Sequence, residues 1–395
     1  MRGTFLISPF YFVSPVIVRT YFDAAYTLAT TTTNATGYTS SKTFTTTEVS
    51  GKNYAIFAMS FLGTPETGTN DARGRLVEGA TQRILNNMEG ADLTDVMSAG
   101  GMYAYAGGTN RTFTYGFSSE VNGDDMTYRG YSLCGLELDG NDYMANSAGS
   151  TTSAATGTNW ASKTSVTVSS GTPKDYIIVA SAAVSANIAT GTPQIRINVA
   201  NASVNTQHGF IDDIFLQDIT NFSPYWYVMR ANNLTNQTIT LEFRAGAIDT
   251  LTTIREASII ALDVSRFTKV YFANSEGNVS TTSTTASNAF VTTFEVANPA
   301  NKHLLLAGAH LSSNIITASA ICKLRNITGA LDYTPEHFRE SNEIGEEYPT
   351  VVARVITLGS NTTNVIAWQF RSETTSVATN LESMSIALLD LGTTV

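Results

Sequence analysis

Most of the chain consists of runs of five to nine residues in which apolar and polar side chains alternate, separated by short turns rich in Gly, Asn, Ser or Thr. In the run TITLEF, from Thr238 to Phe243, every second residue is apolar. A period of two is that of a β-strand with one buried face. No stretch keeps a helical period over several turns, so the pattern predicts an all-β chain.

The same strands recur three times along the chain. A strand that begins KNYAIFA at Lys52 returns as KDYIIVA at Lys174 and as KHLLLAG at Lys302. The aligned positions are Tyr54, Tyr176 and His303 in this strand, Phe117, Phe243 and Phe370 in a later strand, and Ser132, Ser258 and Ser385 in the last strand. Separations are 122 and 127 residues in the first strand and 126 and 127 in the other two. Two strands with the same offsets predict three tandem copies of one module.

Each copy has room for about eight such strands. We therefore expect three tandem antiparallel β-sandwiches, with a jelly roll as the preferred topology and an immunoglobulin-like sandwich as the alternative. The predicted boundaries are an N-terminal arm at 1–20 and modules at 21–141, 142–267 and 268–395. Because the linkers are only a few residues long, neighbouring modules should pack as a short rod or a compact cluster.

One segment in the middle of each copy differs most between the copies. These segments are Thr81–Met97, Gln207–Tyr225 and Tyr333–Tyr348. We expect them to be irregular loops, and loops that vary on a repeated scaffold are the usual place for specific contacts.

Composition narrows the function classes. Only 14% of the residues are charged, 43% are hydrophobic, and the formal net charge is −10. No cluster of Lys and Arg offers a basic face to a phosphate backbone, so we expect no nucleic-acid partner. Cys134 and Cys322 lie on different strands of different copies, which predicts two buried free thiols.

The first 20 residues, MRGTFLISPFYFVSPVIVRT, form an apolar segment. Pro9 and Pro15 interrupt it, and no small-residue cleavage site follows, so we expect neither a signal peptide nor membrane insertion. An apolar arm of this kind should dock on another subunit by strand addition. The residues predicted to make the contact are Phe5, Leu6, Ile7, Phe10, Tyr11, Phe12 and Val16.

No motif in the chain points to catalysis. It has no phosphate-binding GxxxxGK[ST] loop, no GxGxxG fingerprint after a strand and no GxSxG elbow. We predict no catalytic residue, no cofactor and no metal site, and so not an enzyme. Tyr225, Trp226 and Tyr227 are candidate partner contacts, because exposed aromatic rings stack on sugars, but the alternative that alternate rings enter the sandwich core is favoured.

Thr-rich turns lead into a K-x-Y-x-I-x-A strand in SKTFTTTEVSGKNYAIFAMS (41–60) and TSVTVSSGTPKDYIIVASAAVSA (164–186). In this style the chain resembles virion structural proteins of tailed bacteriophages, of the capsid-decoration or tail and fibre type. The resemblance implies tandem jelly-roll-like modules, homo-oligomers, other virion proteins as partners, and synthesis in the host cytoplasm without a signal peptide. A carbohydrate-binding adhesin or receptor-binding protein, with a host surface glycan as partner, is the alternative. A polysaccharide-degrading enzyme is less favoured, because it needs two carboxylates across one groove.

Overall fold

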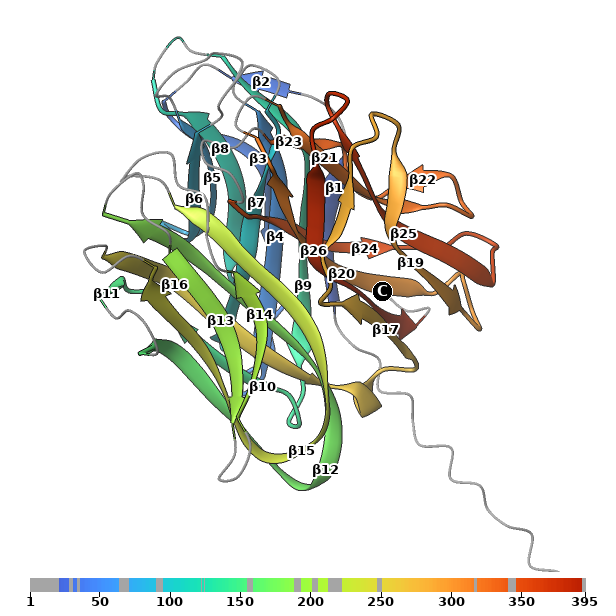
Figure 1. Cartoon of the computed structure of the whole chain (residues 1–395). Coiled ribbons are helices and arrows are strands. Elements are labelled where there is room, and N and C mark those ends of the chain that lie inside the picture. Colours follow the sequence, from blue (N-terminus) through green and yellow to red (C-terminus); the bar gives the residue numbers. More distant parts are fainter. Residues whose placement is uncertain are drawn as a thin grey trace, which may run out of the picture.

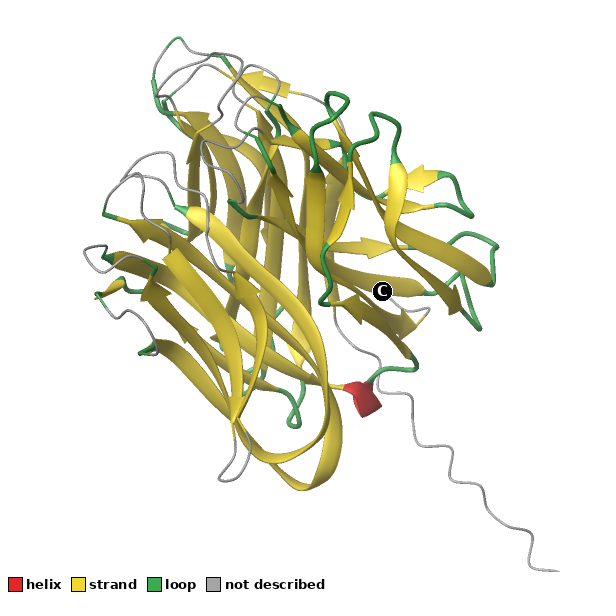
Figure 2. Ribbon diagram, in the orientation of Figure 1, coloured by secondary structure: helices red, strands yellow, loops and turns green. Residues whose placement is uncertain are grey.

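The computed structural model describes residues 21–27, 31–33, 36–63, 71–89, 95–121, 123, 125–154, 159–187, 193–200, 205–211, 222–246, 251–315, 318–339 and 346–392. Within these residues every element is a strand except one short 3-10 turn, η1 (Val264–Arg266) (Figure 2). The strands pair antiparallel throughout. The predicted all-β sandwich fold is confirmed.

The first group of strands forms two sheets. Its strands are β1 (Tyr21–Thr27), β2 (Thr31–Thr33), β3 (Thr39–Thr45), β4 (Asn53–Gly63), β5 (Asp71–Glu78), β6 (Thr81–Glu89), β7 (Met97–Ala106), β8 (Thr112–Ser119) and β9 (Met126–Leu138). One sheet has the order β1-β9-β4-β7, with β2 also on β9, and the other has the order β3-β8-β5-β6. With β1 and β2 counted as one strand, these orders are 1-8-3-6 and 2-7-4-5. Two interleaved Greek keys of this kind define a jelly roll.

The last group of strands repeats this order. Its strands are β17 (Val270–Ser275), β18 (Val279–Thr281), β19 (Ser287–Glu295), β20 (Lys302–Ser313), β21 (Ala320–Asn326), β22 (Leu331–Asp332), β23 (His337–Arg339), β24 (Tyr348–Ile356), β25 (Thr363–Ser372) and β26 (Thr379–Gly392). The sheets run β17-β26-β20-β24 and β19-β25-β21-β22, with β18 on β26 and β23 on β21. This is the same jelly roll.

The middle group has the same topology with fewer breaks. Its strands are β10 (Tyr143–Ser147), β11 (Thr151–Ser153), β12 (Ala161–Ala186), β13 (Pro193–Ala200), β14 (Asn205–Ile211), β15 (Ser223–Ala245) and β16 (Thr252–Asp263). β12 and β15 each run through both halves of the sandwich, which joins them into one sheet of order β10-β16-β12-β15-β13-β14 (Figure 1). The preferred jelly-roll topology is therefore correct in all three copies, and the immunoglobulin-like alternative is wrong. The exact domain boundaries stay a prediction.

The three jelly rolls group around a common centre rather than along a line (Figure 1). We call one sheet of each jelly roll its inner sheet and the other its outer sheet. The inner sheet contains β4 in the first jelly roll, the later half of β12 in the second and β20 in the third. β7, β15 and β24 lie on these inner sheets, and each contacts the other two. Of the two expected packings, rod or cluster, the described strands form the cluster.

The expectation that Thr81–Met97 is an irregular loop was wrong. Its first part is β6, which pairs with β5 along its length. A polar residue on the buried face hides the alternation: Asn86 is fully buried and accepts a hydrogen bond from the Gly100 amide at 2.7 Å. The other two segments also carry short strands, β14 and β23, and parts of all three fall outside the described residues.

Both cysteines are buried and free, as predicted. Burial raises the pKa of the Cys322 thiol to about 12. A thiol in this state is a poor nucleophile, so Cys322 contributes to packing and not to reactivity.

Candidate functional site: the junction of the three jelly rolls

The inner sheets are buried on both faces. In β4, Tyr54, Ile56 and Ala58 enter the core of the first jelly roll, whereas Ala55 and Phe57 face the opposite way. This opposite face joins a single apolar cluster that contains residues of all three jelly rolls. The cluster also includes the sandwich core of the third jelly roll, for example Leu324 and Trp368. We call the part that lies between the jelly rolls the junction, and its burial is the main apolar contribution to holding them together.

At the centre of the junction, side chains of neighbouring jelly rolls bind the free backbone amides of two edge strands. β7 and β24 are edge strands of their sheets, so their outer amides need acceptors from elsewhere. Ser181 of the second jelly roll accepts from the Met102 amide at 3.0 Å. Ser98 of the first accepts from the Val351 amide of the third at 2.9 Å. Small hydroxyls thus let the strands approach closely and still satisfy the buried backbone.

Backbone pairing also crosses between jelly rolls. Asn87 of the first pairs with Phe222 of the second, with N···O distances of 3.3 and 3.0 Å. Phe338 of the third pairs with Val96 of the first, at 2.8 and 3.2 Å. Asn87 and Phe338 hold equivalent positions in their jelly rolls, and so do Phe222 and Val96. The equivalent contact between the second and third would involve residue 212, which lies outside the described residues.

Two equivalent contacts in the same direction define a head-to-tail relation. The third jelly roll presents its outer-sheet edge to the first, and the first presents the same edge to the second. Heterologous contacts that repeat form a ring when the rotation between copies closes, and a filament when it does not. The mutual contacts of β7, β15 and β24 fit a closed arrangement. The single chain therefore builds, from three covalently linked copies, the kind of arrangement that a cyclic trimer builds from three chains.

Trp226 contacts both neighbours of the second jelly roll. Its side chain is fully buried. The indole N–H donates to the carbonyl oxygen of Ala307 in the third jelly roll at 2.9 Å. Its ring meets Phe57 of the first edge-on, with centroids 6.4 Å apart. Trp226 is thus a packing residue of the junction.

The structure describes some of the other predicted partner contacts and not the rest. Tyr225 and Tyr227, which flank Trp226, enter the core of the second jelly roll, as a period of two requires. All three rings are at most 1% exposed, so none offers a face to a sugar on the surface of the described structure. The arm residues, from Phe5 to Val16, lie outside the described residues, and their contact stays a prediction.

Buried charges add specificity at the border of the first and second jelly rolls. The Glu256 carboxylate accepts from the Leu85 amide at 2.5 Å and from Gln82 Nε2 at 2.7 Å. Burial raises the pKa of Glu256, and the neighbouring Arg255 opposes this shift. On the border of the third and first, Arg339 lies 3.6 Å from the Asp95 carboxylate, with both side chains buried. Removal of either partner of the Arg339–Asp95 pair would leave a buried charge uncompensated.

A small cavity of about 30 Å³ lies where the three jelly rolls meet. Its lining includes Met97, Pro224 and Tyr348, one from each jelly roll. His337 also lines it, and its ring is tilted by 37° to that of Phe61, with centroids 4.5 Å apart. Burial lowers the pKa of His337 to about 3, so the ring stays neutral at ordinary pH. The volume suits a few water molecules and is too small for a substrate.

Acidic side chains gather at the border of the second and third jelly rolls. His310 is 1% exposed, and its Nδ1 lies 3.6 Å from the Glu347 carboxylate. Burial, and then the hydrogen bond and charge of Glu347, raise the pKa of Glu382 to about 7. Nearby, the Tyr227 hydroxyl bonds to the Glu276 carboxylate. The border therefore holds one carboxyl group, that of Glu382, whose charge changes near neutral pH.

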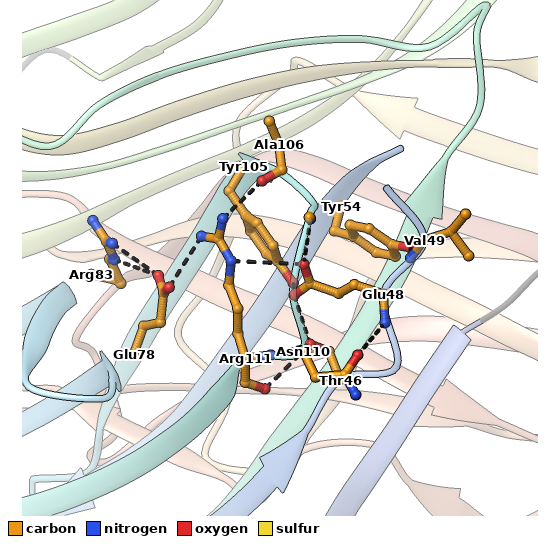
Figure 3. A network of polar contacts seen from close by, with 11 residues as sticks. Thr46, Glu48, Val49, Tyr54, Glu78, Arg83, Tyr105, Ala106, Asn110 and Arg111 are labelled. Carbon is orange, nitrogen blue, oxygen red and sulfur yellow. Dashed lines mark hydrogen bonds and ion pairs between the residues drawn. The ribbon is translucent and has the colours of Figure 1, made fainter. Parts of the chain in front are cut away.

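A further polar network with two close carboxylates lies at the end of the first jelly roll (Figure 3). Arg111 lies between them, 3.1 Å from Glu78 and 3.7 Å from Glu48. Glu48 also accepts from the Tyr105 hydroxyl at 3.0 Å and from the Gly108 amide at 3.1 Å. A glycosidase pair needs one free acid and one free base across a cleft. These two carboxylates are neutralised and saturated, so the network fits a structural role.

Metal and membrane features were also sought. Among the described residues, no three His, Cys, Asp or Glu side chains converge as a metal site would require. None of the helical structure within the described ranges is long and apolar enough to span a bilayer.

Comparisons with known proteins find no matching family and no matching curated protein. Among solved structures, the triple jelly-roll protein of an archaeal virus is 9% identical, with 94% of this chain and 91% of that chain covered and a TM-score of 0.22. A protein of infectious bursal disease virus, Gx strain, is 8% identical, with coverages of 94% and 81% and a TM-score of 0.25. An insecticidal delta-endotoxin of Bacillus thuringiensis is 8% identical, with coverages of 87% and 54% and a TM-score of 0.22. At these scores the likeness carries no information about function.

The junction is the feature that the strand pattern alone missed. One signal could have found it: the aligned strands NYAIFAMSFLG and KHLLLAGAHLSS read as nearly continuous apolar runs. A strand with one wet face alternates, whereas a strand buried on both faces does not.

Proposed function

We propose that the chain is a non-enzymatic structural component of a virion. The observation that supports this is the junction: three jelly rolls share one apolar cluster and make one building block. Glu256 binds groups of the neighbouring jelly roll, and the cavity of about 30 Å³ is too small for a substrate. A block of three packed jelly rolls suits assembly into a shell or a tail better than turnover of a ligand.

We place this component, more specifically, in a tailed bacteriophage, as a capsid-decoration or tail-associated protein. In this proposal the apolar arm at residues 1–20 joins the block to other virion proteins or to copies of itself. The phage assignment is supported by the sequence style alone. The arm is supported by its composition, since ten of its residues from Phe5 to Val18 are large and apolar.

Removal of residues 1–20 tests the proposal. The full chain should form oligomers or bind purified particles, and the truncated chain should remain a folded monomer. Light scattering after size exclusion gives the mass, and circular dichroism checks that the strands remain. If the truncated chain assembles like the full chain, the arm has no assembly role.

A host-surface adhesin is the second candidate. Sugar stacking needs an open aromatic face. The ring of Trp160, half-buried on the outer sheet of the second jelly roll, is covered by the guanidinium groups of Arg196 at 3.9 Å and Arg244 at 4.3 Å. A glycan array probed with the full chain distinguishes the two candidates, because the structural role predicts no selective binding.

A further inference from the structure

Three positions of each jelly roll lie together at the border with the preceding jelly roll of the ring. In the third jelly roll they hold His310 in β20, Glu382 directly opposite it in β26, and Glu347 next to β24. The register of the aligned strands gives the equivalent residues, which are Phe61, Val96 and Arg129 in the first jelly roll and Ala183, Phe222 and Arg255 in the second. The chain thus contains two internal controls for this part of the third jelly roll.

In the first two jelly rolls, no side chain at these positions changes charge near neutral pH. The Phe61 ring lies across the border from the ring of His337 in the third jelly roll, with centroids 4.5 Å apart. The Arg255 guanidinium lies 3.4 Å from the centre of the Phe222 ring and donates to the Leu85 carbonyl of the first jelly roll at 3.3 Å. Because an arginine stays charged at every ordinary pH, these positions keep the same charge in acid and in alkali.

In the third jelly roll, all three positions carry titratable side chains. His310 is buried, its Nδ1 lies 3.6 Å from the Glu347 carboxylate, and its ring centroid lies 6.4 Å from that of Tyr227 in the second jelly roll. Glu347 and Glu382 share a hydrogen bond. Such a bond needs a proton on one of the two groups, because a carboxylate can only accept. One proton therefore joins two carboxyl groups at this border.

The surroundings do not supply a cation for the second carboxylate. Among the described residues, the charged groups that act on Glu382 are Glu347 and His310. The other titratable side chains at this border are His208, Tyr225 and Tyr227 of the second jelly roll and Glu276 of the third. Glu276 adds a third carboxylate, which the Tyr227 hydroxyl binds. In the second jelly roll, by contrast, Arg255 places a positive charge at the position of Glu382.

We call His310, Glu347 and Glu382 the acid latch, and we propose that it makes the border of the second and third jelly rolls pH-sensitive, closed while the two carboxyl groups share a proton and open once that proton leaves. Without the proton, two negative charges face each other in a buried site and repel. In the open state the two jelly rolls separate along β15 and β20, which contact each other, and water reaches the carboxylates. The latch is a property of the block itself and does not depend on the particle that contains it.

The pKa values of the latch give the pH range over which it is closed. Burial, and then the hydrogen bond and charge of Glu347, raise the pKa of Glu382 from its usual 4.5 to about 7. Its contribution is therefore present at acid pH and lost as the pH rises through 7. Burial lowers the pKa of His310 to about 4, so the ring is neutral around pH 7 and does not compensate the second carboxylate. The contribution of His310 is lost only as the pH falls through 4.

The same values give the size of the effect. Opening exposes Glu382 to water and returns its pKa to the usual value. Linkage between a pKa of 4.5 in the open state and about 7 in the closed state makes the opening constant rise about tenfold between pH 6 and pH 8.5.

Two tryptophans report on the opening. The Trp226 indole N–H crosses this border and donates to the carbonyl of Ala307, three residues before His310 on β20. The Trp368 indole N–H donates to the carbonyl of Ser385 inside the third jelly roll at 3.3 Å and serves as the internal control. Exchange of a bonded N–H with solvent requires opening, so its protection factor measures the opening constant.

Hydrogen exchange of the full chain, labelled with nitrogen-15 at tryptophan and followed by NMR at pH 6 and pH 8.5, tests the latch. After correction for the intrinsic rate at each pH, the protection factor of Trp226 should fall about tenfold. It should also be lower than that of Trp368 at both pH values, because the border opens without unfolding the third jelly roll. Glu382→Gln can hydrogen-bond but has no proton to lose, so Trp226 should then be equally protected at both pH values.

Glu295→Gln is the matched control, because it removes an exposed carboxylate from the outer sheet of the same jelly roll and should leave the fall unchanged. Glu382→Arg introduces the residue of the first two copies and should remove the fall in the same way as Glu382→Gln. A Trp226 protection factor that is independent of pH in the unmodified chain, or a fall that persists in both Glu382 variants, would overturn the latch. Equal protection of Trp226 and Trp368 would also overturn it, because the border would then open only when the whole chain unfolds.

Discussion

Truncation of Trp226 is the sharpest perturbation of the junction. A buried tryptophan removes about 150–250 Å² of surface from water, which at about 25 cal/mol per Å² is about 4–6 kcal/mol. Measured losses for Trp→Ala in cores are about 3–5 kcal/mol. We therefore expect Trp226→Ala to lower the free energy of unfolding by about 4 kcal/mol. Trp226→Phe keeps most of the ring but loses the hydrogen bond to Ala307, and should cost about 1–2 kcal/mol.

Urea unfolding followed by far-ultraviolet circular dichroism measures these losses without relying on tryptophan emission. Trp160→Ala is the control, because Trp160 is half-buried outside the junction; loss of its stacking on Arg196 and Arg244 should cost about 1 kcal/mol. If the three jelly rolls share one core, the transition should be single and shift as a whole. A Trp226→Ala loss no larger than that of Trp160→Ala, or a shift in only one of several transitions, would refute the reasoning.

Three further changes probe other parts of the junction. Because the folded pKa of Glu382 is raised to about 7, its contribution is present at acid pH and lost as pH rises through 7; unfolding free energy should fall from pH 5 to 8, and Glu382→Gln should flatten that slope. Glu256→Ala orphans a buried amide of the first jelly roll and should cost about 1–3 kcal/mol in urea unfolding, whereas Glu256→Gln should cost less. At Gly100, with φ at +145°, a Cβ would lie 2.2 Å from a carbonyl oxygen of β4; Gly100→Ala should lower the thermal midpoint by several degrees, and Gly108→Ala, in open space, should not.

Local pattern was enough for the strands and the repeat. The side chains in TITLEF alternate because one face of the strand is exposed to solvent and the other is buried. Successive residues of a strand point to opposite faces, so this pattern is local. The repeat can be recognised from the sequence alone, because the aligned Phe and Ser residues recur at matching offsets. For the same reason the pattern failed at β6, where buried Asn86 replaces an apolar residue and finds its partner, the Gly100 amide, on another strand.

The sequence by itself determined three copies of an eight-stranded β-module, two buried thiols and an apolar arm. The tertiary structure decided the strand order. It also decided that the inner sheets are covered on the face that points away from their own sandwich core. Whether Trp226 enters a sandwich core or a neighbour depends on how whole sheets dock, a long-range property that no window of residues contains. The junction and the role of Trp226 in it are therefore visible only once the copies are placed side by side.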